Sequence, residues 1–255
     1  MRQRNSYSRI IQDITDWEQA PKGEIIRLYH HCVEKNITSF MITGSNRQIP
    51  KTELPGIALS ESGLSRDEIQ LLGGMSRIPG DSDELVLQVE NLLLKLDTDY
   101  LDLFFLDLNT PTEVIMPAIE RLFSQGKIVE TGVYDLHRPG SNFTPHKNTV
   151  KANISKWDFT PAAVKSLLLK EPFSEEIEEM LWIHISDPNN LKPLEQMAQK
   201  YSLSEQELLF AWLLHHEVPF HLVLGGRDKE LINSASKALH TTLIQEDWQN
   251  LPKKL

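Results

Sequence analysis

Acidic residues that end apolar segments are the residues of this chain whose positions suggest chemistry. The segment LDLFFLDLN (101–109) is almost wholly Leu and Phe, and Asp102 and Asp107 are its only charged residues. A continuous apolar run of this length is typical of a strand buried on both faces. Asp107 then lies where the strand leaves the core, which in parallel α/β folds is the functional edge of the sheet.

Asp135, His137 and Asp187 also follow segments that we predict to be strands. Two carboxylates and a histidine that face one pocket could bind a divalent metal ion or act as an acid–base pair. These candidates come from different strands and show no ligand spacing such as H-x-x-x-H or D-x-D, so we predict no metal site. For Asp107 a structural alternative remains open, in which the carboxylate anchors its loop by accepting backbone N–H groups near Thr110.

The elements that must position these residues alternate between strands and helices. We predict strands at residues 8–14, 37–43, 68–74, 101–108, 127–136, 150–155, 181–186 and 219–226. Apolar periodicity and capping residues predict helices at 24–36, 83–96, 111–126, 194–216 (broken near Ser202) and 228–239. This order favours one α/β domain over residues 1–255, folded as a (β/α)8 TIM barrel.

Two connections depart from the alternation. The first is predicted to be a loop that contains Gly44, Pro50, Pro55 and Gly56. The second, residues 135–150, contains Pro139, Gly140 and Pro145, which leave little room for a helix. The barrel is therefore expected to be shortened at its fifth crossover, and either that helix is missing or the sixth strand is misplaced.

The composition excludes several classes of protein. The 255 residues are 40% hydrophobic and 24% charged, as in ordinary globular proteins. The net charge is −10 and the 26 basic residues form no long cluster, which argues against a nucleic-acid or anionic-membrane surface. No apolar segment has the length of a signal peptide or a membrane span. The single cysteine, Cys32, falls in a predicted helix, so we expect a buried packing role in a reducing, cytoplasmic setting.

The histidines have structural interpretations. The adjacent pairs at 30–31 and 215–216 lie in predicted helices, where neighbouring side chains point about 100° apart. Neither pair would chelate one ion easily, so we expect surface or capping residues. His184 alternates with its strand neighbours, so if Ile185 faces the barrel mouth, His184 faces the helices as a hydrogen-bonded structural residue.

The tryptophans and one acidic cluster also have structural interpretations. We expect packing in the core or at its rim for Trp17, Trp157, Trp182 and Trp212. We expect a solvated helix face for Glu175, Glu176, Glu178 and Glu179.

Several segments, in the same order along the chain, resemble the aldo-keto reductase family. LLLKLDTDYLDLFFLDLN is similar to that family's helix ending in K-x-L-x-T-D-Y and the fourth barrel strand after it. IERLFSQGKIVETGV resembles its L-x-x-x-G-K-I-x-x-x-G-V turn and fifth strand, and YSLSEQELLFAWLLHH resembles its Y-x-x-S-x-x-x-x-x-x-A-W-L-L helix. LGGRDKELINSASKAL occupies the place of its phosphate-binding loop and helix. The resemblance covers most of the chain and implies an NADP-dependent oxidoreductase that acts on carbonyl compounds.

The resemblance also implies a catalytic tetrad, which this chain lacks. In the family, Asp, Tyr, Lys and His pass a hydride from NADPH to a carbonyl, with Tyr as the general acid and the Lys ammonium tuning its pKa. The four positions fall here on Met41, Asn46, Gly74 and Asp107. Asp107 therefore stands where the family has its substrate-orienting histidine, and we predict little or no reductase activity.

The cofactor end of the resemblance is better preserved, in the residues Gly225, Gly226, Arg227 and Glu230. Backbone N–H groups and a cation at this turn could bind the phosphate of NADP(H). An ordinary strand-to-helix connection would look the same, since a short glycine motif is a weak signal on its own. Ile185 replaces an aromatic residue that would stack on the nicotinamide, and Tyr134-Asp135 replace the pair that would hold its carboxamide.

Three functions remain open from the sequence. The first is an aldo-keto reductase-like pseudoenzyme that keeps a nicotinamide nucleotide or another small-molecule ligand at the barrel mouth. The second is an enzyme with rebuilt chemistry around Asp107 and Asp135. The third is a non-catalytic barrel that binds a protein partner through the face of the shortened crossover, with the partner unknown.

Overall fold

Eight parallel strands close into a barrel in the computed structural model, which describes residues 7–42, 52–75, 77–134, 150–160, 163–164, 167, 177–185 and 188–254. Each strand pairs with the next one along the chain, and β8 pairs with β1. The strands are β1 (Ile10–Asp13), β2 (Ser39–Met41), β3 (Gln70–Gly74), β4 (Leu101–Leu106), β5 (Ile128–Tyr134), β6 (Val150–Asp158), β7 (Glu178–His184) and β8 (His221–Leu224). All eight predicted strands and the (β/α)8 TIM barrel are confirmed.

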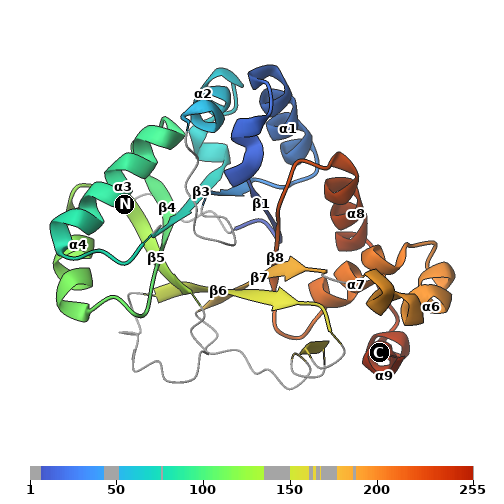
Figure 1. Cartoon of the computed structure of the whole chain (residues 1–255). Coiled ribbons are helices and arrows are strands. Elements are labelled where there is room, and N and C mark those ends of the chain that lie inside the picture. Colours follow the sequence, from blue (N-terminus) through green and yellow to red (C-terminus); the bar gives the residue numbers. More distant parts are fainter. Residues whose placement is uncertain are drawn as a thin grey trace.

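Helices flank most of the strands of this barrel (Figure 1). They are α1 (Lys22–Glu34), α2 (Leu54–Glu61), α3 (Ser82–Leu96), α4 (Thr112–Ser124), α6 (Glu195–Lys200), α7 (Glu205–Leu214), α8 (Lys229–Leu239) and α9 (Gln245–Lys254). Shorter 3-10 turns are η1 (Thr15–Gln19), η2 (Arg66–Glu68) and η3 (Pro188–Leu194). In Figure 1, α9 lies at the end of the chain beside α6 and α7.

Strand side chains divide between the barrel interior and the layer under the helices. The interior cluster takes alternate strand residues, among them Ile11, Met41, Leu72, Leu103, Phe105, Ile154, Met180, Trp182 and Val223. The strand register agrees with this division, because it pairs Ile11 with Val223 and Leu72 with Leu103. Successive strand side chains point to opposite faces, so the intervening residues face the helices.

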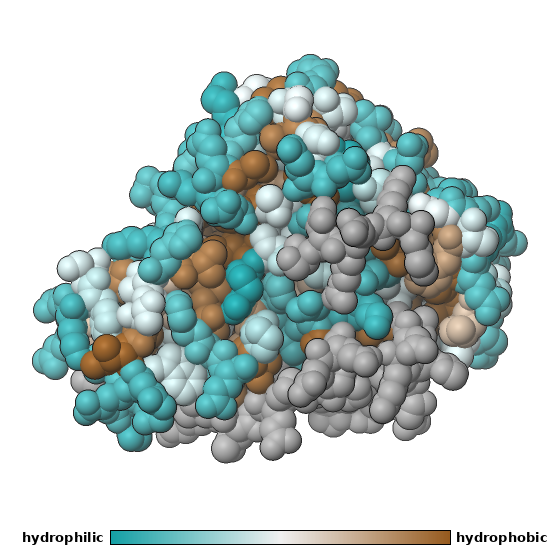
Figure 2. Space-filling view, turned by 180° about the vertical axis from the view of Figure 1, so that it is seen from behind, coloured by the Kyte–Doolittle hydropathy of each residue, from teal (hydrophilic) through white to brown (hydrophobic). Residues whose placement is uncertain are grey.

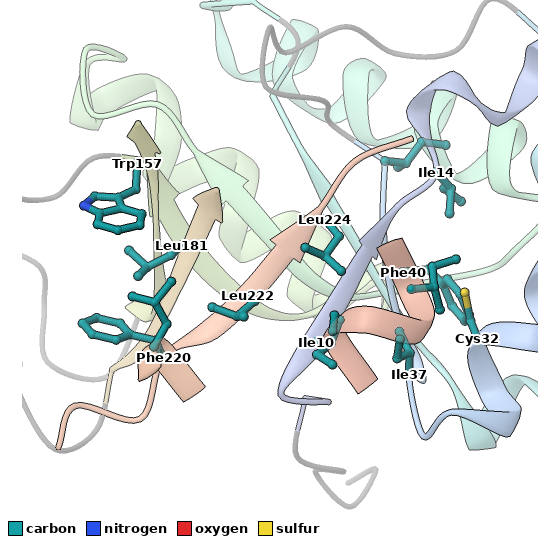
Figure 3. Packing of buried hydrophobic residues seen from close by; sticks show 14 of the residues in the cluster. Ile10, Ile14, Cys32, Ile37, Phe40, Trp157, Leu181, Phe220, Leu222 and Leu224 are labelled. Atoms are coloured by element: carbon teal, nitrogen blue, oxygen red, sulfur yellow. The ribbon is translucent and has the colours of Figure 1, made fainter. Parts of the chain in front are cut away.

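The larger apolar cluster lies between the strands and the helices, as Figure 3 shows for β1, β2, β7 and β8. Cys32 on α1 points toward Phe40 on β2 in this layer and is completely buried. Burial raises the pKa of its thiol to about 12, so it is almost wholly protonated at neutral pH. The buried packing role expected for Cys32 is confirmed.

The loop predicted around Pro55 and Gly56 is wrong in part, because these residues begin helix α2. Proline fits the first turn of a helix, where its missing N–H would have no helical partner. Gly56 lets α2 approach the end of α3 closely, since a Cβ at this position would lie 2.5 Å from the carbonyl oxygen of Lys95. Packing against α3 therefore outweighs the low helix propensity of glycine.

Other predicted signals for element boundaries are confirmed. Asp81 caps α3 by accepting a 2.8 Å hydrogen bond from the backbone N–H of Glu84. The break near Ser202 separates α6 from α7, and Ser202 adopts a left-handed φ of 55°. The sixth strand is present and runs to Asp158, so it was not misplaced. The predicted shortened crossover at 135–149 lies outside the described residues.

The amino-terminal ends of the strands are held by a polar cluster that includes one of the predicted acidic residues. The Tyr7 hydroxyl donates to Glu130 at 2.8 Å, and His221 lies 3.0 Å from Glu178. The prediction that Glu178 and Glu179 occupy a solvated helix face is wrong, because both belong to β7. Glu179 is buried and accepts a 2.9 Å hydrogen bond from Asn153 on β6. Glu175 and Glu176 lie outside the described residues.

The four tryptophans are buried and the expectation of core packing is confirmed. His30 is exposed, and His215 lies at the end of α7 with its ring nitrogen 2.8 Å from the carbonyl of Ala211. His216 accepts from the backbone N–H of Val218 but is buried rather than on the surface.

The face of the molecule seen in Figure 2 is mainly polar where it is coloured. Figure 2 shows hydrophilic side chains over much of the visible face, with hydrophobic side chains in separate areas between them. No helix in the described part of the chain is both long and apolar enough to cross a membrane.

Candidate functional site

The carboxyl ends of the eight strands meet at one edge of the barrel, which we call the mouth. In (β/α)8 barrels this edge carries the active site. Extending the alternation of the interior cluster to the strand ends gives the described residues that face the mouth: Asp13, Met41, Gly74, Asp107, Tyr134, Lys156, His184 and Gly225.

Two of the positions that the family resemblance assigns to the tetrad lie here and carry no ionisable group. Met41 is the last residue of β2 and is completely buried in the interior cluster. Gly74 is the last residue of β3 and has no side chain. A thioether is at most a weak hydrogen-bond acceptor, so neither position can donate a proton or supply a cation. Asn46 lies outside the described residues.

Asp107 directly follows β4 and is 3% exposed. Its Oδ1 accepts hydrogen bonds from the backbone N–H and the side-chain amide of Asn109, both at 2.8 Å. The Asp107 carbonyl accepts from the backbone N–H of Thr110 at 3.0 Å. The loop-anchoring contacts considered for Asp107 are therefore present. Its proposed partner Asp135, together with His137 and Asp187, lies outside the described residues.

The turn predicted to bind the cofactor follows β8. Hydrogen bonds to one of its backbone carbonyl groups hold it in place. Gly226 has a φ of 84°, a conformation that favours glycine. Its carbonyl oxygen accepts from the Gln12 amide and from the Trp17 indole, both at 2.9 Å. These two bonds fix the turn to β1 and η1.

The charged residues of this turn already have intramolecular partners. The guanidinium of Arg227 lies 3.8 Å from Glu24 at the start of α1, and both side chains are partly exposed. Asp228 caps α8 by accepting from the backbone N–H of Glu230 at 2.9 Å. A phosphate at this turn would have to compete with Glu24 for Arg227 and with Asp228 for a backbone donor.

Asp13 is a mouth residue that the sequence analysis did not single out. It ends β1, is 4% exposed and lies next to Met41 in the β1–β2 register. Its Oδ1 accepts from the backbone N–H of Thr15 at 2.9 Å and from the Thr15 hydroxyl at 2.5 Å. A Cβ built on Gly225 would lie 4.0 Å from Oδ2 of Asp13 and 3.9 Å from Cζ2 of Trp182. Asp13 and Trp182 therefore border the same space over Gly225.

The environment of Asp13 changes its acidity. Burial raises the pKa of Asp13 to about 7, against the lowering effect of the Thr15 hydrogen bonds, and the charge of Asp16 adds to the increase. The segment IIQD shows the same signal as LFFLD, an acid at the end of an apolar strand. Applying the Asp107 argument to the first strand would have identified Asp13.

The predicted orientation of His184 is wrong. Met180 and Trp182 belong to the interior cluster, whereas Ile183 and Ile185 pack in the layer under the helices. Strand alternation then directs His184, which is exposed, toward the mouth. Tyr134 at the end of β5 packs on Phe105 with ring centroids 5.5 Å apart.

The described residues contain no group of three or more His, Cys, Asp or Glu side chains arranged to hold a metal ion. The ionisable side chains that strand alternation directs to the described mouth are Asp13, Asp107, Tyr134, Lys156 and His184, from five different strands or their ends. Such an arrangement can exchange protons and hydrogen bonds with a small ligand.

Comparisons with known proteins give distant sequence relatives and close structural ones. No protein-family model matches the chain. It is 23% identical over 279 residues to an uncharacterized oxidoreductase of Bacillus subtilis, YcsN, with 95% of this chain and 92% of the relative covered. It is 24% identical over 216 residues to another uncharacterized oxidoreductase of the same organism, YtbE, with 82% and 73% covered.

Among solved structures, the chain is similar to an aldo/keto reductase from Klebsiella pneumoniae crystallised in complex with NADP and acetate. The TM-score is 0.71 at 16% identity, and the match covers 97% of this chain and 91% of that one. At this identity the similarity establishes the barrel fold.

Proposed function

We infer that this chain is a divergent aldo-keto reductase, built as one domain over residues 1–255, that keeps the barrel without the family's tyrosine–lysine reduction chemistry. The distant similarity to oxidoreductases and the shared barrel support membership of the family. We propose that the mouth binds NADP(H) or a small carbonyl compound, and that the protein resides in the cytoplasm.

The observation that carries the proposal is that Met41 and Gly74, at the ends of β2 and β3, have no ionisable side chain. In the family these positions supply the aspartate and the lysine that tune the acidic tyrosine. The family's tyrosine depends on that ammonium to bring its pKa nearer the working pH, and the corresponding positions here supply neither the tyrosine nor the lysine. Hydride transfer to a carbonyl would then lack the proton donor that the family uses.

Retention of the dinucleotide depends on the turn after β8. The pinned carbonyl of Gly226 and the guanidinium of Arg227 are consistent with a phosphate subsite. Because Glu24 partly neutralises Arg227, we expect binding of NADP(H) to be weaker than in a reductase with an unpaired arginine.

A binding titration with NADPH and NADP⁺, followed by nucleotide fluorescence and calorimetry, tests the cofactor. We expect micromolar to submillimolar binding that weakens in Arg227→Ala. Arg121→Ala is the matched control, because Arg121 is an exposed arginine of α4 that pairs with Asp83. No binding up to millimolar nucleotide would remove the dinucleotide from the proposal.

NADPH oxidation with a panel of aldehydes tests the loss of reductase activity. We expect no turnover above the rate without enzyme. Turnover at about 1 per second or faster, typical of working enzymes, would contradict the proposal.

The second candidate function is rebuilt chemistry around Asp107 and Asp135. It is favoured by the burial of Asp107 at a strand end. Loss of any such activity in Asp107→Asn would support it, provided that the variant remains folded.

A further inference from the structure

The carboxyl group of Asp13 has one oxygen that the fold uses and one that it does not. Oδ1 accepts two hydrogen bonds from Thr15 and thereby holds the first residue of the η1 turn. Within the part of the chain that the structure describes, no group donates a hydrogen bond to Oδ2. The turn requires a single acceptor oxygen, which an asparagine would supply equally well.

Burying a carboxyl group at this position costs free energy. The side chain is almost completely buried, and its neighbours across the interior are Met41, Trp182 and Gly225. An ionised carboxylate loses most of its hydration in such surroundings. A structural role for Oδ1 alone does not explain why a carboxyl group stands here.

Oδ2 borders a position that Gly225 leaves without a side chain. Gly225 leaves the space over β8 free of a side chain, and the nearest atoms to a Cβ there are 3.9 and 4.0 Å away, on Trp182 and Asp13. Within 4 Å of that Cβ position lie one aromatic carbon, of Trp182, and one carboxyl oxygen, of Asp13. This combination suits a small, flat, mainly apolar molecule with one polar group.

We propose that Oδ2 of Asp13 is the polar contact for the carbonyl oxygen of a small uncharged ligand that binds over Gly225 against the Trp182 ring. This inference rests on the proposed function, because it specifies the ligand contact at the same mouth. The Thr15 hydrogen bonds occupy Oδ1 and so direct the carboxyl proton to Oδ2. The protonated acid then donates to the carbonyl, as the family's tyrosine would.

The charged groups around Asp13 are consistent with its carboxyl group losing its proton near neutral pH. Asp16 on η1 is the neighbouring charge that acts on it, and it raises the pKa of Asp13 in addition to the effect of burial. The adjoining strand positions, Met41 on β2 and Gly225 after β8, carry no titratable group. Lys156 on β6 is the register partner of Trp182 and faces the same interior. Arg227 lies beyond the turn and is paired with Glu24.

The carbonyl could belong to the nicotinamide carboxamide or to a separate aldehyde or ketone. Free nicotinamide and acetophenone represent the two sources, and toluene is the control without a carbonyl. Binding is followed by the change in tryptophan fluorescence from pH 5 to 9, with Trp182→Phe identifying the reporting ring. Binding of nicotinamide alone assigns the contact to the dinucleotide, and binding of acetophenone alone assigns it to a substrate.

We expect affinity for the bound probe to fall as pH rises through about 7, by roughly the three- to tenfold that one hydrogen bond contributes. Asp13→Asn retains the Oδ1 acceptor and gains an N–H donor, so it should fold normally and bind without this pH dependence. Asp13→Ala should weaken binding roughly three- to tenfold at low pH, the value of one hydrogen bond. Asp16→Asn should move the midpoint to lower pH, which a purely structural aspartate would not do.

Wild-type affinity and pH dependence in Asp13→Ala would overturn the proposal, as would failure of both probes to bind the wild-type protein. Circular dichroism checks that each variant is folded. The titration contains no hydride donor, so its outcome is independent of the turnover assay. Measured reductase activity would contradict the proposed loss of activity but would leave the proposal about Asp13 unaffected.

Discussion

Asp107 is fixed by Asn109, which donates to its Oδ1 both a backbone and a side-chain hydrogen bond, each 2.8 Å long. The acid at the end of the most apolar strand therefore anchors the loop that leads from β4 to α4. Asp107 itself is 3% exposed, whereas Asn109 lies at the surface. A position that resembles a catalytic histidine in sequence thus has a structural task in this fold.

Removal of this anchor should destabilise the protein. Asp107→Ala removes the acceptor of both Asn109 donors, and because Asn109 is exposed, water can replace part of the lost bonding, so the total cost should be about 0.5–1.5 kcal/mol. Asp107→Asn keeps one acceptor oxygen and should cost less. Urea unfolding followed by circular dichroism measures both changes. Equal stability of the alanine variant and the wild-type protein would show that the loop does not depend on this contact.

Asp13 should make folding stability depend on pH. Its pKa is raised from 3.8 to about 7 in the folded state, so the folded protein binds more protons than the unfolded chain between these values. Stability from this group is therefore fully present below about pH 4 and is lost as pH rises to about 7, at up to about 1.4 kcal/mol per pH unit.

Comparison with Asp13→Asn isolates this effect from other titrating groups. Relative to the wild-type protein, the variant should become progressively more stable between pH 4 and 7, with a constant difference above that range. Urea unfolding at unit pH intervals measures the difference. A difference that does not change with pH would mean that Asp13 has an ordinary acidity in the folded protein.

Gly56→Ala should destabilise the packing of α2 on α3. The new methyl group would lie 2.5 Å from the backbone carbonyl oxygen of Lys95, so one helix must move. Overpacking of this kind typically costs about 1–3 kcal/mol. Gly23→Ala in α1 is the control, because its Cβ would meet only the flexible end of Arg27 at 3.7 Å. Thermal unfolding should show a lower Tm for Gly56→Ala and an unchanged or higher one for Gly23→Ala.

The buried pair Asn153–Glu179 should be important for the β6–β7 contact. Both side chains are almost inaccessible, and the Asn153 amide donates to Glu179 at 2.9 Å. Asn153→Ala removes a donor from a buried carboxylate and should cost about 1–3 kcal/mol. Glu179→Gln keeps an acceptor oxygen and should cost less in the same unfolding assay. The reverse order would indicate that the glutamate charge matters more than the hydrogen bond.

Much of the barrel was determined by the local sequence. Apolar runs of strand length, helical periodicity, the Asp81 cap and the break at Ser202 act within a few residues, and each appears in the structure. The tertiary structure was needed to place α2. Pro55 and Gly56 are residues of turns in most contexts, and only the close approach to α3 favours a helix there.

The sequence by itself also determined that strand side chains alternate, but not which set faces inward. The neighbouring strands decide that, since β7 buries Met180 and Trp182 inside the barrel and so turns His184 to the mouth. The same holds for Asp13. Its pKa is raised by burial beside Met41, Trp182 and Gly225, which lie on three other strands or at their ends. Burial in a closed barrel is a property of all eight strands together, so no single segment of sequence contains it.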